Sequence, residues 1–340
     1  MEEISRRWLA RSGLSPQAID LALSLSGLRP SLSEWREFAV RVMRLAGILS
    51  LAAGMIFLVA FNWDSLGTYA RFGSVEVPLL AALLIAWIKG ADRLPGKLAL
   101  MLAVLLTGAL LALFGETYQT GADVYELFLG WAVLSLPWVV ACRYAPCWGL
   151  WLLLANAAVG LYSGTNGQDW FLIVFRDRMH WSPWTLPFLL NLLLYITIVR
   201  LSAWKDFGLA DAWLRRGVMA IAMMFGTFIM IYRISDGGGQ PGTTLLEVIL
   251  FLVASVAFAS HAFSRKDDLF NFAVLALAWI AVTSTLLARA IIDAGLGAAL
   301  VLALYVIGTS TAAVKGIGHI GRQWRLAPAP LPSPPSEVIP

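Results

Sequence analysis

Apolar residues fill long stretches of this chain, and short polar segments separate the stretches. A helix needs about 20 mostly apolar residues, within a range of about 17–25, to cross a bilayer. Ten stretches approach that length: Met43–Phe61, Val75–Ile88, Leu98–Gly115, Tyr125–Ala141, Trp148–Tyr162, Trp184–Val199, Gly217–Tyr232, Thr244–Ala262, Leu269–Ala288 and Ala294–Val314. The pattern predicts an all-α, polytopic transmembrane helix bundle of about ten spans.

Some of these stretches are unusual in length or spacing. The second, fifth and seventh are short for a full span, so we expect them to borrow flanking residues or to tilt less than their neighbours. Only a few residues separate the last two stretches, between Ala288 and Ala294. We expect a tight helical hairpin there rather than one long buried helix.

The two ends of the chain differ from its apolar middle, residues 42–316. Residues 1–41 place apolar side chains at helix-like spacing, with helix start signals at Ser15-Pro16 and at Ser31, three residues before Glu34. We predict a small cytoplasmic helical head whose third helix continues into the first span. Residues 317–340 end in a proline-rich segment and are predicted to form a disordered cytoplasmic tail.

Composition supports a membrane environment. Hydrophobic residues make up 59% of the chain and charged residues 14%, whereas soluble domains average about 45–50% apolar and 25% charged. The mean hydropathy is +0.75. The surplus apolar surface is therefore expected to face lipid, which makes the bilayer the first partner of this protein.

The basic residues give the expected orientation, because cytoplasmic loops are enriched in Lys and Arg. With the N-terminus inside, 20 of the 25 basic residues fall on the cytoplasmic side. Those that fall outside are Arg71, Arg176, Arg178, Arg233 and Arg289. Both termini are thus predicted to be cytoplasmic. The same topology accounts for the net charge of +4, so we predict no nucleic-acid partner.

The clearest polar cluster follows the third stretch on the predicted outer side. The segment GETYQTGADVYELF contains no Lys or Arg. Asp123 and Glu126 are three residues apart and share a face if the segment is helical. Together with Glu116 they fit an acidic pocket for a cation or a proton, or an acid–base pair. A polar loop that caps two helices explains the same residues, and the sequence leaves both interpretations open.

Glu247 lies about one turn into the eighth stretch, near the predicted outer interface, where a side chain can reach water by snorkelling. The candidate ligand-binding residues are Glu116, Tyr118, Gln119, Asp123, Glu126 and Glu247. Three asparagines, Asn156, Asn191 and Asn271, lie within or at the ends of spans and are expected to bond to neighbouring helices.

Signatures of catalysis or metal binding are missing from the sequence. The glycine run after Asp236 lacks the Lys-Ser/Thr of a phosphate-binding loop, and neither GxSxG nor HExxH occurs. The histidines His180, His261 and His319 are scattered, and Cys142 and Cys147 have no second pair. We therefore predict no cofactor, no metal site and no catalytic residue, and interpret the cysteines as two unremarkable thiols.

Three segments resemble a known family. They are Trp8–Pro16, Phe61–Asp64 and, above all, GETYQTGADVYELFLGWAVLSLP. They are similar to the bacterial predicted membrane proteins grouped as domain of unknown function 2157 (DUF2157), over about Trp8 to Ser163. The resemblance implies a cytoplasmic helical head followed by many spans in a bacterial inner membrane. It brings no activity, cofactor or catalytic residue.

Three hypotheses for function follow. The first is a transporter or sensor whose acidic outer pocket binds a small cation, a proton or a polar ligand. The alternative is a non-catalytic scaffold or assembly factor that binds a protein partner through residues 1–41. A lipid-modifying enzyme is third, because the sequence offers no recognisable nucleophile or metal-ligand set.

Overall fold

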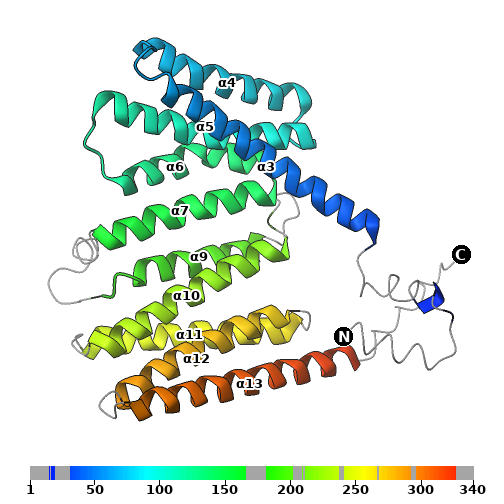
Figure 1. The fold of residues 1–340 in the computed structure, drawn as a ribbon, viewed down its shortest axis with the longest axis vertical. Helices are drawn as coiled ribbons and strands as arrows, with labels where there is room; N and C mark the ends of the chain where they lie inside the picture. The colour runs from blue at the N-terminus through cyan, green and yellow to red at the C-terminus, as the bar shows by residue number, and fades with distance from the viewer. Residues whose placement is uncertain are drawn as a thin grey trace, which may run out of the picture. The chain divides into compact units, whose positions relative to one another are not determined.

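The computed structural model describes residues 15, 17–19, 31–165, 181–201, 209, 211–236, 241–265, 268–291 and 296–326. These residues form long α-helices and no strand, so the predicted all-α class is confirmed (Figure 1). The helices are α3 (Leu32–Phe61), α4 (Thr68–Lys89), α5 (Leu94–Tyr118), α6 (Val124–Cys142), α7 (Ala145–Thr165), α9 (Thr185–Leu201), α10 (Ala212–Asp236), α11 (Pro241–Arg265), α12 (Leu269–Ile291) and α13 (Leu296–Leu326).

Each of the ten predicted stretches coincides with one of these helices. Within the described ranges, nine helices are long and apolar enough to cross a bilayer, and α9 is apolar but has 17 residues. The second, fifth and seventh stretches do borrow flanking residues, since α4, α7 and α10 have 22, 21 and 25 residues. The sixth stretch is therefore the short one. The chain is a multi-pass membrane protein.

The ends of the bundle extend further than the apolar stretches. A capping box starts α3, in which Ser31 Oγ accepts the Glu34 N–H at 3.2 Å and the Glu34 carboxylate accepts the Ser31 N–H at 2.6 Å. At the other end, α13 runs past residue 316 to Leu326. Residues 1–14, 16 and 20–30 of the head and 327–340 of the tail lie outside the described residues, and the domain limits stay predictions.

The chain divides into two compact units, Met1–Leu113 and Phe114–Pro340. The first contains α3, α4 and most of α5. Its core is formed by Ala52, Val59, Val75, Ala82, Leu102, Ala103, Leu106 and Leu113. A tight turn joins α4 to α5: Gly90 has φ +83°, and a Cβ on Gly96 would lie 2.1 Å from the Gly90 oxygen. These two positions therefore require glycine.

In the second unit, α10 packs on α7, α9, α11 and α12, while α6 packs on α7 and α13 on α12. Its core includes Phe188, Met219, Met223, Phe251 and Phe258. Successive helices of this unit run in opposite directions (Figure 1). The starts of α6, α9, α11 and α13 therefore lie at the same end as the ends of α7, α10 and α12. We call this the outer end, after the predicted topology.

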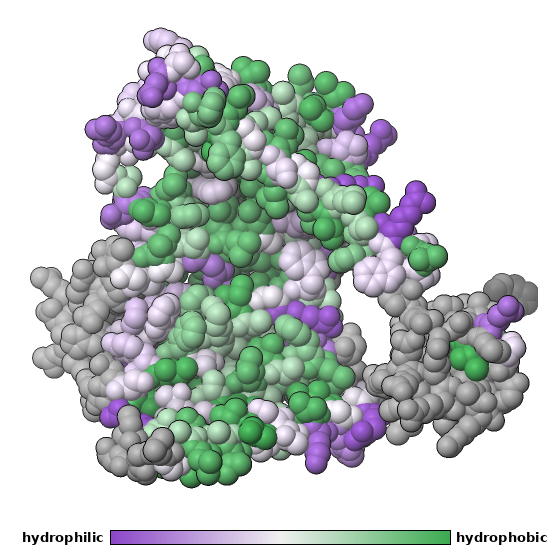
Figure 2. All heavy atoms as spheres, in the orientation of Figure 1, coloured by the Kyte–Doolittle hydropathy of each residue, from purple (hydrophilic) through white to green (hydrophobic). Residues whose placement is uncertain are grey.

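Large apolar side chains cover the outside of the helices of the second unit. Leu153, Val256, Leu277 and Leu304 are all more than 60% exposed, and hydrophobic residues cover much of the visible helix surface in Figure 2. The most apolar part of α13 has no buried residue. Such a surface is stable only in contact with hydrocarbon, because water would be ordered around it.

Candidate functional site: a buried carboxylate shared by three helices

Glu247 is the only one of the six candidate residues that is fully buried among the described residues. It lies in the second turn of α11, and its carboxylate is bonded to two other helices. Oε1 accepts the Ser182 N–H at 2.8 Å and the Thr185 hydroxyl, both at the start of α9. Oε2 accepts Arg233 Nε at 2.6 Å, from the last turn of α10. One side chain thus joins α9, α10 and α11 at the outer end.

The Arg233–Glu247 ion pair is removed from solvent. The exposed fractions of the two side chains are 6% and 0%. Helix polarity favours both charges, because Arg233 lies at a C-terminus and Glu247 bonds to the N-terminus of α9. Moving two charges out of water is expensive, and only close pairing with further hydrogen bonds offsets that cost. The carboxylate meets this condition with bonds from Arg233, Ser182 and Thr185.

The other candidate residues lie where α5 ends and α6 begins. Glu116, Tyr118, Gln119, Asp123 and Glu126 are all exposed. Gln119 has φ +43°, a left-handed conformation that often ends a helix. The Glu126 carboxylate accepts the Asp123 N–H at 3.2 Å, which caps the first turn of α6.

The structure therefore separates the six candidates into two groups. Asp123 and Glu126 meet each other at the start of α6, as their spacing indicates. Glu247 instead belongs to a network with Arg233, Ser182 and Thr185. Whether any of the six residues binds a ligand stays a prediction.

Arg233, the partner of Glu247, is a functional candidate that the sequence pattern did not single out. Its signal was present: Arg233 is one of five basic residues on the predicted outer side, and Glu247 is an acidic residue at membrane depth on the next helix. Both lie close to the connection between α10 and α11. Opposite charges near the same end of consecutive antiparallel helices can pair, and a charge inside the membrane needs such a partner.

A second ion-pair network lies at the opposite end of the same unit. Arg216 Nε donates to Asp268 Oδ1 at 2.9 Å, and an Arg215 terminal nitrogen lies 3.5 Å from Oδ2. Asp268 precedes α12, whereas both arginines lie in the first two turns of α10. The Arg216 side chain is 36% exposed, so this network is more open to water than the outer one, where the most exposed partner, Arg233, is 6% exposed.

Two of the intramembrane asparagines bond across helices, as predicted. Asn191 Nδ2 on α9 donates to Asn156 Oδ1 on α7 at 2.6 Å, and also to the Pro187 carbonyl at 2.8 Å. Asn271 is buried, and its Oδ1 has no hydrogen-bond partner among the described residues. The Asn156–Asn191 pair therefore joins α7 to α9 through neutral groups alone.

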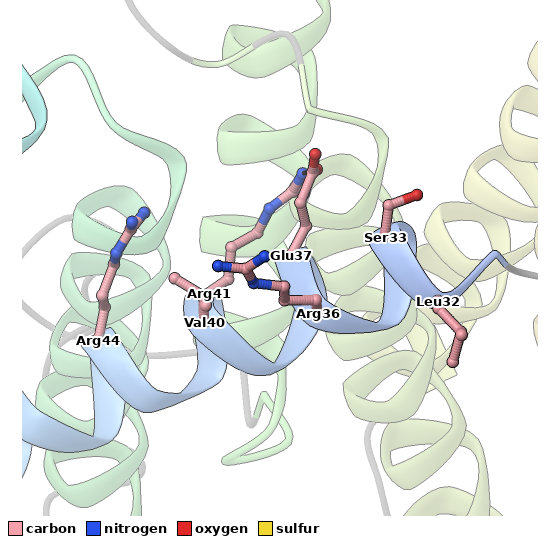
Figure 3. Close-up of a pocket in the computed structure, with 7 residues that line it drawn as sticks. All are labelled: Leu32, Ser33, Arg36, Glu37, Val40, Arg41 and Arg44. Atoms are coloured by element: carbon pink, nitrogen blue, oxygen red, sulfur yellow. Dashed lines mark hydrogen bonds and ion pairs between the residues drawn. The ribbon is translucent and has the colours of Figure 1, made fainter.

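In the first unit, the start of α3 carries three arginines along an open hollow of about 690 Å³ (Figure 3). Arg36, Arg41 and Arg44 line it, and Arg41 pairs with Glu37 at 3.0 Å. Both partners of this ion pair are more than two-thirds exposed, and exposed pairs contribute little stability. The arginines agree with the predicted cytoplasmic position of this helix end, and they do not form an enclosed site.

No group of three or more His, Cys, Asp or Glu side chains suited to hold a metal ion occurs in the part of the chain that the structure describes. The absence of a metal site stays a prediction. The candidate chemistry of the described helices therefore consists of ion pairs and hydrogen bonds.

The N-terminal part of the chain matches a known family. Residues 6–148 match the family model described as "Predicted membrane protein (DUF2157)", which confirms the resemblance indicated by the three sequence segments. The match includes the polar segment from Glu116 to Glu126 and ends before α9, α10 and α11. No curated protein and no solved structure was found to match the chain.

Proposed function

We propose that this protein is a transporter or sensor that binds a small cation or a proton from the outer side, with Glu247 as the central ligand-binding group. The observation that carries this proposal is the complete burial of the Glu247 carboxylate in an ion pair between helices. Ionisable residues at membrane depth are costly and most often functional. A structural role alone would be served as well by apolar side chains of similar volume.

Binding at this site is a competition between positively charged groups for the Glu247 carboxylate. Arg233 neutralises Glu247 in the structure, so a proton or a metal cation competes with the guanidinium for the same oxygens. When it binds, Arg233 loses its partner and the contact between α10 and α11 weakens. Two arrangements of these helices would then be coupled to the occupancy of Glu247, as transport and sensing both require.

The exposed carboxylates have a smaller part in this proposal. Glu116, Asp123 and Glu126 lie at the outer end in water, where salt screens charges over about 8–10 Å. They raise the local concentration of cations near the outer end without forming an enclosed site. In this proposal one buried carboxylate, with an acidic surface on the same side, takes the ligand-binding role that the sequence pattern assigned to a pocket of Glu116, Asp123 and Glu126.

The proposed setting is a bacterial inner membrane with both termini in the cytoplasm. Support comes from the charges at the helix ends: Lys89, Arg93 and Lys97 surround the α4–α5 turn, and Arg143 lies in the α6–α7 turn. The charged residues of the polar segment at the other end of α5 are all acidic. The alternative role as a scaffold rests on residues 1–41, of which residues 1–14, 16 and 20–30 lie outside the described part.

The experiment is cation and proton flux in proteoliposomes. Wild-type protein is compared with Glu247→Gln and with the double variant Arg233→Gln/Glu247→Gln, in which no buried charge is left without a partner. We expect ²²Na⁺ or ⁸⁶Rb⁺ uptake, or acidification reported by an enclosed pH dye, in the wild type only. Because a sensor moves no ions, cation binding is also measured by calorimetry in detergent.

Glu116→Gln is the matched control, because it removes an exposed carboxylate on the same side. It should retain most of the flux or binding. If the double variant is folded and still binds or transports like the wild type, the assignment of Glu247 is wrong. Wild-type protein without any flux or binding above empty vesicles would remove the proposed function itself.

A further inference from the structure

The two cysteines meet at the end of the second unit opposite to the outer end. Cys142 is the last residue of α6, and Cys147 is the third residue of α7. Their sulfur atoms lie 2.7 Å apart, and neither is in a disulfide bond. The sequence pattern predicts two unremarkable thiols, whereas the structure brings them into direct contact.

The turn between the helices produces this contact. Arg143 adopts a left-handed conformation with φ +47° and ψ +39°, which ends α6 and reverses the chain. The Cys147 N–H then donates to the Tyr144 carbonyl at 3.0 Å in the first turn of α7. Further along the helices, Trp151 Nε1 donates to the Ala132 carbonyl at 2.8 Å. The Arg143 turn on one side of the cysteines and the Trp151 hydrogen bond on the other thus hold α6 and α7 together.

Burial restricts what can reach the sulfurs. Both cysteines are 0% exposed, and the adjacent Val139 and Ala145 are buried as well. Any reagent therefore reaches the sulfurs only through local opening, and a small neutral molecule needs a smaller opening than a bulky reagent does. The contact between the thiols means that once one sulfur is oxidised, the other is already in place to react with it.

Distance distinguishes oxidation from metal binding. A disulfide bond is about 2.05 Å long, so closure requires the sulfurs to approach by less than about 1 Å. Metal–thiolate bonds of about 2.3 Å hold two sulfurs of a tetrahedral site about 3.8 Å apart, so a metal ion would push them away from each other. Such a site also needs further ligands, and the described residues hold no group of three.

We propose that Cys142 and Cys147 form a reversible disulfide when a peroxide oxidises one of them. One thiolate attacks a peroxide oxygen, which breaks the O–O bond, gives a sulfenic acid and, with hydrogen peroxide, releases water after protonation. The second thiol attacks the sulfenic sulfur and expels a second water. A dithiol reductant restores both thiols by exchange. The bond links the end of α6 covalently to the start of α7.

The predicted cytoplasmic position of the two cysteines decides which of their redox forms is the resting one. Cytoplasmic reductants keep most thiols reduced, and disulfides there are mainly transient or redox-sensing. The reduced pair is therefore the resting form, and the disulfide marks exposure to an oxidant. This modification site is independent of the Glu247 site and does not rest on the proposed transport function.

The test uses the full chain in detergent and hydrogen peroxide as the oxidant. After peroxide treatment and removal of peroxide by catalase, the protein is unfolded, alkylated with iodoacetamide and digested with trypsin. Arg143 lies between the two cysteines, so cleavage there leaves two peptides that stay joined only if the disulfide has formed. We expect this joined pair from the wild type, and its disappearance after treatment with dithiothreitol.

Cys142→Ser and Cys147→Ser are the matched controls. In each variant the remaining cysteine has no second thiol beside it, so we expect a sulfenic acid instead of a joined peptide pair, and dimedone added while the protein is unfolded traps it. Two alkylated cysteines in the wild type at every peroxide dose would overturn the proposal. Joined peptides found only in dimers of the chain would overturn it too, since the geometry requires closure within one molecule.

Discussion

Two groups of carboxylates lie at the outer end of the second unit, and they differ in almost every physical respect. Asp123 and Glu126 are exposed and form a local helix cap, three residues apart in sequence. Glu247 is buried and bonds to residues 14, 62 and 65 positions away. The first group serves one helix end, whereas Glu247 holds three helices in one arrangement.

This comparison shows that burial, more than the number of acidic residues, decides what a carboxylate can do in a membrane protein. In water an ion pair gains about 1 kcal/mol or less, because solvent and salt screen it. Away from water the same charge must be paired, and the pair becomes sensitive to any competing cation or proton. Stability measurements on variants can test this difference directly.

The largest effect is expected at Glu247. Replacement by alanine leaves the buried Arg233 without its partner, and such a loss costs about 3–5 kcal/mol. The readout is thermal unfolding in detergent, followed by tryptophan fluorescence. Replacing both members, as in Arg233→Met/Glu247→Leu, should recover most of the loss, because no unpaired charge then remains. Equal destabilisation by the single and double variants would show that the ion pair is not what Glu247 contributes.

A smaller effect is expected at the opposite end of the unit. Asp268→Ala removes the partner of both Arg215 and Arg216, but water reaches Arg216 and can replace part of the lost interaction. We expect a destabilisation of about 2–3 kcal/mol in the same assay. Added salt should weaken the effect of this variant more than that of Glu247→Ala, because salt screens accessible charges more strongly.

The asparagine pair separates the contribution of charge from that of burial. Asn191 is buried like Glu247 but neutral, and its partner Asn156 lies on α7. Hydrogen bonds between membrane helices contribute about 0.6 kcal/mol on average and at most about 1.7. Asn191→Leu should therefore cost about 1 kcal/mol. A loss of stability as large as that of Glu247→Ala would mean that burial of a polar contact, with or without charge, sets its contribution to stability.

The smallest effects are expected in the exposed group. Glu126→Ala removes the cap at the start of α6, and we expect a loss of about 1 kcal/mol or less. Glu116→Gln should leave the unfolding temperature unchanged within the error of the measurement. If either variant destabilises the protein as much as Asp268→Ala, the polar segment from Glu116 to Glu126 does more than cap α6. The hypothesis of an acidic pocket would then regain support.

The sequence by itself determined the solvent of this protein and its series of helices. All ten apolar stretches correspond to helices, because a spanning segment must satisfy its backbone hydrogen bonds internally and show lipid an apolar surface. Local signals also held, such as the capping box from Ser31 to Glu34. Each of these features depends on residues that are close in sequence, and they can therefore be predicted from it.

Tertiary structure alone decided which polar residues of different helices meet. The pairing of Glu247 with Arg233, and its bonds to Ser182 and Thr185, depend on how α9, α10 and α11 pack. The contact between Cys142 and Cys147 depends on the left-handed backbone conformation of Arg143. Residues other than glycine seldom adopt this conformation. A hydropathy pattern gives the length and direction of each helix, but not its rotation or its neighbours. Interactions between helices depend on both, and for this reason only the fold reveals them.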